Sequence, residues 1–145
     1  MPMVNSFNAG IWNKLETKVR GWVGNATSRV WNNNFDALYV CKGGTIDSSD
    51  NILRYLGSGN NKIPVPKYFF MALLAKNSQG YKALGFWIEH NANTDKATAL
   101  ANFVVNVRQL EQLTGIDFFC NLPDDTEERV ETLAVDNVKA AWGLK

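Results

Sequence analysis

Apolar side chains recur at spacings of three and four residues near the start of the chain. They mark the core-facing side of an amphipathic helix, formed by Phe7, Ile11, Leu15, Val19 and Trp22. Glycines at positions 21 and 24 end this pattern. We therefore predict a helix over residues 7–23, followed by a connection rich in Asn and Ser over residues 25–36.

Two long apolar runs predict a buried antiparallel hairpin. The first, residues 67–75, follows Pro64 and Pro66, and proline is tolerated at a strand start because no ladder donor is needed there. The second is residues 81–89, and the turn sequence between the runs predicts a four-residue loop over residues 77–80. Because both runs are almost wholly apolar, we expect both faces of the sheet to be covered.

Weaker patterns surround this hairpin. Residues 37–41 predict a short strand that ends before a pair of glycines, and residues 52–56 predict an edge strand within a polar surface excursion. Residues 90–100 are polar and predict a loop, and residues 102–105 predict another short strand. The strands are therefore predicted to form an antiparallel sheet.

Helices are predicted again after the strands. Asn106 caps the first of them, Gln109 occupies the capping-box position, and Gly115 ends it. A second helix begins near Asp124 with acidic residues in its first turn, which suits the positive end of the helix dipole. Residues 138–142 predict a weakly helical tail. The fold class predicted from these elements is α+β, with an antiparallel sheet flanked by helices.

Length and composition indicate one domain spanning residues 1–145. Hydrophobic residues make up 46% of the chain and charged residues 20%, as in ordinary globular domains with a real core. No apolar run approaches the ~20 residues of a membrane span, so no membrane partner is expected. Residues 1–5 have neither the basic start nor the apolar stretch of a signal peptide.

The formal net charge is only +1, but the charges are unevenly distributed. The first 30 residues have a balance of +3, from Lys14, Lys18, Arg20 and Arg29 against Glu16. Residues 117–131 have a balance of −5, from six acidic residues against Arg129. A polyanion would therefore approach the N-terminal part first, although both blocks also fit ordinary solvated faces.

The cysteines and the histidine belong to no recognisable motif. Cys41 and Cys120 lie among apolar neighbours without metal-ligand spacing, so free buried thiols are expected, with a disulfide between them as the alternative. His90 is the only histidine and follows a predicted strand. A lone histidine at such a place predicts a surface residue.

A polar stripe runs beside the apolar face of the first helix. Residues four apart drift by about 40° around a helix, so Asn8, Trp12, Glu16 and Arg20 form one slowly turning line. The line combines a candidate metal ligand, an acceptor and an anion-binding donor. Plainer alternatives exist: Asn8 as the helix N-cap, Glu16 and Arg20 as an exposed helix pair, and Trp12 as a core residue.

Three segments in this order resemble the DNA/RNA non-specific endonucleases, the ββα-metal (His-Me finger) nucleases that include endonuclease G. The segments are residues 7–20 with Phe-Asn-Ala-Gly-Ile-Trp, residues 65–70 with their partner 82–86, and residues 110–124 with Thr-Gly-Ile-Asp-Phe-Phe and Asn-Leu-Pro-Asp. The resemblance covers only the C-terminal part of the family domain. The family's Asp-Arg-Gly-His motif, which carries the general-base histidine, is absent from the chain.

The resemblance implies roles for the polar stripe. Asn8 would bind Mg²⁺ or a similar divalent cation directly, and Glu16 would hold a metal-bound water. Arg20 would neutralise phosphate oxygens, and with Lys14 and Lys18 it would contact the nucleic acid. The missing histidine would deprotonate the attacking water.

The implied function is metal-dependent, non-specific endonuclease activity, which hydrolyses phosphodiester bonds of DNA and RNA. Without its general base and several strands, the chain alone is expected to be inactive or incomplete, and to need a complementing N-terminal segment or a homodimer. The alternative is a non-catalytic interaction module, or a decayed nuclease fragment, that self-associates through exposed sheet edges. Family members are often exported, which makes export a weak expectation for the location.

Overall fold

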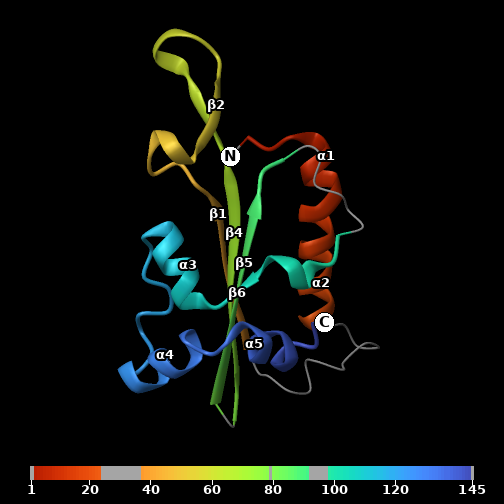
Figure 1. Cartoon of the computed structure of the whole chain (residues 1–145), viewed down its shortest axis with the longest axis vertical. Coiled ribbons are helices and arrows are strands. Elements are labelled where there is room, and N and C mark those ends of the chain that lie inside the picture. Colours follow the sequence, from red (N-terminus) through yellow and green to blue (C-terminus); the bar gives the residue numbers. More distant parts are fainter. Residues whose placement is uncertain (1, 24–36, 79, 92–97, 145) are drawn as a thin grey trace.

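A computed structural model of the chain describes residues 2–23, 37–78, 80–91 and 98–144. Its centre is a four-stranded antiparallel sheet, with helices along both faces (Figure 1). The strands follow the order β1 (Ala37–Gly44), β4 (Tyr68–Asn77), β5 (Gly80–Glu89) and β6 (Val104–Val105). No helix in the described part of the chain is long and apolar enough to cross a membrane. The predicted α+β class is confirmed.

Strands β4 and β5 form the hairpin predicted from the two apolar runs. Leu73 lies in the core on one face and its neighbour Leu74 in the core on the other, because successive strand side chains point to opposite faces. The expected burial of both faces is thereby confirmed. The predicted four-residue loop is wrong: pairing continues to Asn77 and Gly80, which leaves two residues between the strands.

A separate two-stranded sheet projects beyond one end of the main sheet (Figure 1). The predicted strand over residues 52–56 is present, but it pairs with residues expected only to precede the next strand. Pro64 therefore lies inside a strand, opposite Tyr55, where a two-stranded ribbon leaves it an open edge. This arm contains β2 (Ile52–Leu56), β3 (Ile63–Pro66) and the 3₁₀ turns η2 (Ser49–Asn51) and η3 (Gly59–Asn61).

One face of the main sheet is covered by the predicted first helix and by the end of the chain. The helix begins two residues earlier than predicted and contains a π-helical turn. Its aromatic residue Trp22 packs against Trp142, with 4.9 Å between the ring centroids. The elements on this face are α1 (Asn5–Phe7), the π-turn η1 (Asn8–Trp12), α2 (Asn13–Val23) and α5 (Val135–Ala141).

The other face is covered by α3 (Val107–Thr114) and α4 (Asp124–Glu131). The predicted capping box of α3 is confirmed: the Gln109 N–H donates to Asn106 Oδ1 at 2.8 Å, and the Asn106 N–H donates to Gln109 Oε1 at 2.9 Å. Gly115 ends the helix with a φ of 73°. The strand predicted over residues 102–105 is shorter, because residues 100–103 form a 3₁₀ helix, η4.

Some predictions fall on residues that the structure does not describe, namely the connection over residues 25–36, Gln79 of the hairpin turn and most of the loop over residues 90–100. Cys41 and Cys120 are free, as expected, but both are exposed, so their predicted burial is wrong. Cys41 lies on strand β1, where residues 39–42 are all exposed.

The prediction for His90 is also wrong, because this side chain is only 2% exposed. The Val4 N–H donates to Nε2 at 2.8 Å, and Nδ1 lies 2.8 Å from the Pro66 carbonyl oxygen. An accepting Nε2 assigns the proton to Nδ1, which then donates to Pro66. The ring also packs edge-on against Phe7 and Phe69, so His90 joins the chain start to the end of β5.

Replacing His90 by alanine is expected to lower the free energy of unfolding by about 2–4 kcal/mol, because it leaves a cavity and two unpaired backbone groups. His90→Phe restores most of the volume without the hydrogen bonds and should cost less. Urea denaturation followed by tryptophan fluorescence measures both. A loss below about 0.5 kcal/mol for His90→Ala, the range of ordinary surface substitutions, would contradict the structural role.

Candidate nuclease half-site

The polar stripe of the first helix is interrupted by a kink. Gly10, within the π-turn, has φ −96° and ψ −112°, which is not helical, so the residues before and after it do not share one straight face. Asn8 is exposed at this turn, whereas Trp12 is only 4% exposed and packs against Phe69. Trp12 is therefore a core residue, as the plainer alternative held. The N-cap alternative for Asn8 is wrong, since the helix begins at Asn5.

Glu16 forms an ion pair that the sequence did not predict. Lys42 Nζ of β1 donates to Glu16 Oε1 at 2.6 Å. The carboxylate is partly buried, with 24% of its side chain exposed, whereas the ammonium is 53% exposed. The partners lie 26 residues apart, so only the packing of α2 across β1 brings them together. The helix-pair alternative is wrong for Glu16, which pairs with Lys42 instead of Arg20.

Arg20 lies one turn beyond Glu16 on the same side of α2. Its Nη2 donates to Thr17 Oγ1 at 3.1 Å, and the guanidinium is exposed. A shallow pocket of about 120 Å³ lies between α2 and the sheet at this point. It is lined by Glu16, Val19, Arg20, Val40, Lys42 and Met71. The structure thus brings the Glu16 carboxylate, the Arg20 guanidinium and the Lys42 ammonium together at one place on the surface.

The other two basic residues of the helix lie elsewhere. Lys14 and Lys18 are each two residues from Glu16 along α2, a rotation of about 200°, which places them on nearly the opposite side. Lys14 Nζ donates to the Thr98 carbonyl oxygen at 2.9 Å. Lys18 is exposed. The three predicted nucleic-acid contacts therefore do not form one continuous patch.

The donor set fits a hard divalent cation. An exposed amide oxygen at Asn8 and a partly buried carboxylate at Glu16 are the oxygen ligands that Mg²⁺ accepts, and this ion keeps several of its waters. Eight residues and the kink at Gly10 separate the two side chains, which suits a shared ion that contacts one of them directly and the other through water. Asn8 and Glu16 are the residues that would hold such an ion. The chain's one histidine, His90, is buried and both of its ring nitrogens are engaged, so it is not placed to serve as a base there.

The fold defines the class of protein. Its architecture matches a chain in the crystal structure of the EndoG/EndoGI complex with a TM-score of 0.63 and 20% sequence identity, over 85% of this chain and 49% of that chain. The two chains therefore share their fold, an antiparallel sheet with helices packed against it.

Sequence comparison then identifies the family. The family model of the DNA/RNA non-specific endonucleases matches residues 1–125, and the chain belongs to this family. It is 28% identical over 126 residues to human mitochondrial endonuclease G, covering 83% of this chain and 39% of that protein. It is 28% identical over 140 residues to human mitochondrial nuclease EXOG, covering 91% and 35%. The chain thus spans less than half the length of these relatives.

A fungal relative is also similar over a shorter stretch. A nuclease of Syncephalastrum racemosum is 34% identical over 68 residues, which cover 47% of this chain and 21% of that protein. The relatives are thus nucleases from animals and a fungus, and the resemblance read from the three sequence segments is confirmed.

Proposed function

We propose that this chain supplies the metal-binding and phosphate-binding half of a non-specific endonuclease that hydrolyses DNA and RNA. The observation that carries the proposal is the family match over residues 1–125, which includes the helix bearing Asn8, Glu16 and Arg20. The exposure of Asn8 and the shared side of Glu16 and Arg20 support it.

Each residue has a defined task in this proposal. The Asn8 amide oxygen holds Mg²⁺ or a similar divalent cation, which when bound stabilises the charge that develops on the phosphate and leaving oxygens. Glu16 orients water beside Asn8, and Arg20 binds the phosphate oxygens. Lys42 holds the Glu16 carboxylate in place and adds a positive charge beside the phosphate position.

The general base must come from outside these 145 residues. The one histidine, His90, is buried and binds backbone groups through both ring nitrogens. We infer that a complementing segment carrying Asp-Arg-Gly-His, or a second protein chain, supplies the histidine. A missing general base commonly costs 10²- to 10⁴-fold in rate, so the isolated chain is expected to be nearly inactive.

A complementation assay tests this function. Supercoiled plasmid and single-stranded RNA are incubated with the purified chain, with and without Mg²⁺, and with and without a polypeptide carrying the Asp-Arg-Gly-His segment. We expect Mg²⁺-dependent cleavage of both substrates only in the complemented mixture. Cleavage by the chain alone would contradict the need for an outside base. A folded, complemented mixture without activity would contradict the nuclease function.

Arg20→Gln is expected to weaken non-specific binding of duplex DNA and to reduce the slope of log K against log salt by about 0.9, the loss of one phosphate contact. Lys14→Gln is the matched control, because its ammonium already binds the Thr98 carbonyl on the far side of the helix. Fluorescence anisotropy at several salt concentrations measures both slopes. Equal slopes for wild type and Arg20→Gln would remove Arg20 from the interface.

The second candidate is a non-catalytic module that self-associates. Strand β1 is an edge of the main sheet in the described part of the chain, and its Tyr39 and Val40 are 52% and 45% exposed. An exposed apolar edge is a ready surface for strand pairing. Sedimentation at rising concentration tests this alternative, which predicts association without any dependence on Mg²⁺ or Asn8.

A further inference from the structure

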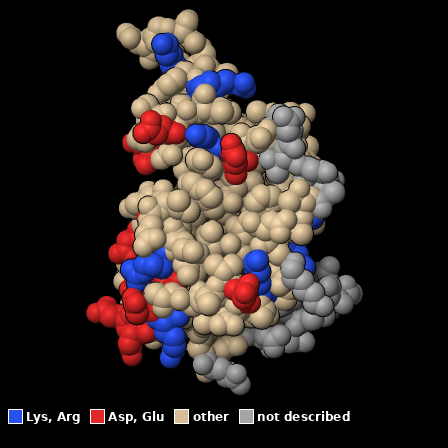
Figure 2. All heavy atoms as spheres, viewed as in Figure 1, with Lys and Arg blue, Asp and Glu red and all other residues tan. Residues whose placement is uncertain are grey.

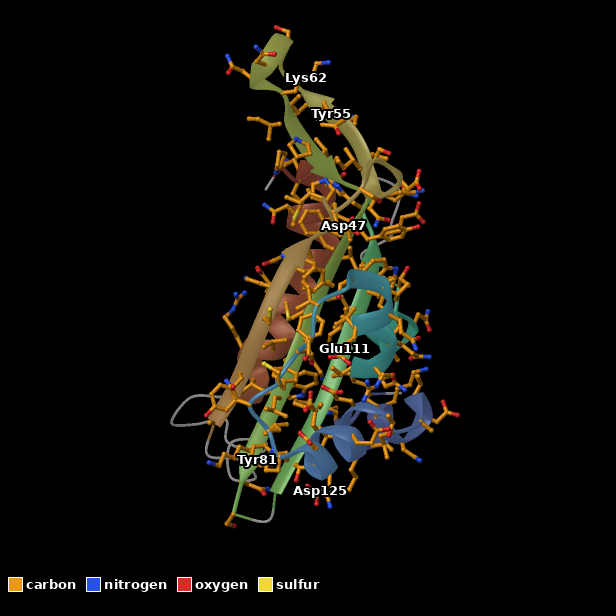
Figure 3. All side chains as sticks on the ribbon, turned by 90° about the vertical axis from the view of Figure 1, so that its left-hand side faces the viewer. Asp47, Tyr55, Lys62, Tyr81, Glu111 and Asp125 are labelled. Atoms are coloured by element: carbon orange, nitrogen blue, oxygen red, sulfur yellow. The ribbon has the colours of Figure 1, made fainter. Side chains whose placement is uncertain are left out.

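A group of acidic side chains lies on the opposite face of the sheet from the candidate site formed by Asn8, Glu16 and Arg20. Figure 2 shows acidic residues gathered over α3 and α4, with basic residues among them. Figure 3 shows Glu111 on α3 and Asp125 near the start of α4. A surface pocket of about 450 Å³ opens between these elements, and its charged lining residues are Arg108, Glu111, Asp117, Asp124, Glu127 and Glu128.

Glu131 lies beside this pocket and is the most unusual carboxylate of the group. Its side chain is only 1% exposed, and neither of its oxygens has a hydrogen-bond partner. The nearest positive group, Arg108 Nη2, is 3.4 Å from Oε2 but outside hydrogen-bond geometry. A buried carboxylate that accepts no hydrogen bond is costly, because an ion pair at 3.4 Å replaces only part of the hydration it has lost.

Two other carboxylates converge on the same point. One ligand oxygen from each of Glu111, Glu127 and Glu131 lies within 4.8 Å of the other two. Glu111 is held in place, since its Oε2 accepts from the Phe118 N–H at 2.9 Å. The three side chains come from α3 and α4, two helices that the fold packs together against β5.

The charge of the group is not balanced by its own residues. Arg108 is shared: its Nη2 donates to the exposed Glu128 at 2.6 Å, and its Nη1 lies 3.7 Å from Glu111. Burial, with the neighbouring Glu111 and Glu127, raises the pKa of Glu131 to about 7. Burial also raises the pKa of Glu111 and of Glu127, with nearby Asp117 acting in the same direction. These directions are those expected where several carboxyls crowd together.

We propose that Glu111, Glu127 and Glu131 form a binding site for a hard divalent cation, calcium in preference to magnesium. Oxygen ligands alone favour Mg²⁺ or Ca²⁺ over transition metals. Calcium takes several carboxylates at 2.3–2.6 Å, so ligand oxygens up to about 5 Å apart suit it, whereas magnesium demands a tighter octahedron. A cation at this position gives the Glu131 oxygens, which accept no hydrogen bond, a direct ligand bond, and it ties α3 to α4. This site is separate from Asn8 and does not depend on the proposed nuclease function.

Calcium binding to the intact, chelator-treated chain tests the proposal, by titration calorimetry and by thermal unfolding at matched ionic strength. We expect a dissociation constant of about 10⁻⁵–10⁻³ M. At about 100 times that concentration, calcium should raise the melting temperature by roughly 5–10 °C, and magnesium should raise it less. No saturable binding above matched sodium chloride would overturn the site and would favour a proton shared between Glu111 and Glu131.

Variants separate this site from other acidic positions. Glu131→Gln keeps the shape of the buried side chain, and Glu127→Gln changes a half-exposed position that folding tolerates more readily. Both should abolish the calcium-dependent shift. Asp125→Asn, an exposed position in the first turn of α4, and Asn8→Ala should retain it. A shift that survives both Glu131→Gln and Glu127→Gln, or that disappears in Asn8→Ala, would overturn the proposal.

Discussion

Asn8→Ala is expected to lower Mg²⁺-dependent cleavage in the complemented assay by about 10²- to 10³-fold, as for loss of a group that stabilises transition-state charge. The side chain is exposed on a helical turn, and alanine has the higher helix propensity, so stability should not fall. Initial rates on plasmid and RNA give the effect on activity, and thermal unfolding gives the effect on stability.

Asn13→Ala is the matched control for this experiment. It removes the same amide from an exposed position of the same helix, five residues further along. It should retain cleavage within a factor of about two, the size of effect expected for a surface substitution. Equal activity of Asn8→Ala and wild type would show that metal binding, if any, uses other residues.

Trp142→Ala is expected to have the largest effect on stability, a loss of about 3–5 kcal/mol. The indole, at the end of α5, is fully buried and packs against Trp22. Its Nε1 donates to the Ala83 carbonyl oxygen at 3.2 Å, so its removal leaves both a large cavity and an unpaired backbone group. Since domains of this size have a total stability of roughly 5–15 kcal/mol, the variant should unfold at far lower urea concentration.

Trp142→Phe distinguishes the two components of this loss. Phenylalanine fills most of the cavity but cannot donate to Ala83, so the expected cost is about 1–2 kcal/mol. Urea denaturation followed by far-ultraviolet circular dichroism is suitable, because it does not depend on the tryptophan that is removed. A loss below 1 kcal/mol for Trp142→Ala would contradict the central position of this residue in the core.

The proposed calcium site and the candidate site on the first helix lie on opposite faces of the same sheet. The polar residues of α2 face the nucleic acid in the proposed function, whereas Glu111, Glu127 and Glu131 join α3 to α4. Calcium is therefore expected to stabilise the scaffold without taking part in hydrolysis. In the complemented assay this difference is directly visible, because Glu131→Gln should retain Mg²⁺-dependent cleavage while Asn8→Ala loses it.

Local sequence patterns predicted much of the fold. They also identified the first helix as the one that carries the candidate site. The spacing of Phe7, Ile11 and Leu15 predicted the core face of the first helix, and each of the three is fully buried. The Asn106–Gln109 capping box is equally local, since its two hydrogen bonds join residues three apart. The same helix carries Asn8, Glu16 and Arg20 in the order that the family resemblance requires.

Contacts between distant residues decided the rest, and no local pattern encodes them. His90 was expected at the surface, but Val4, 86 residues away, covers it, and Lys42 reaches Glu16 only because β1 packs against α2. The burial of Glu131 follows in the same way, from α4 packing against α3 and the sheet. Hydrophobic periodicity depends on neighbours a few residues apart, and the sequence therefore determined the elements and their buried faces. Whether a polar side chain is covered, and by which partner, depends on how whole elements meet, and only the tertiary structure decided it.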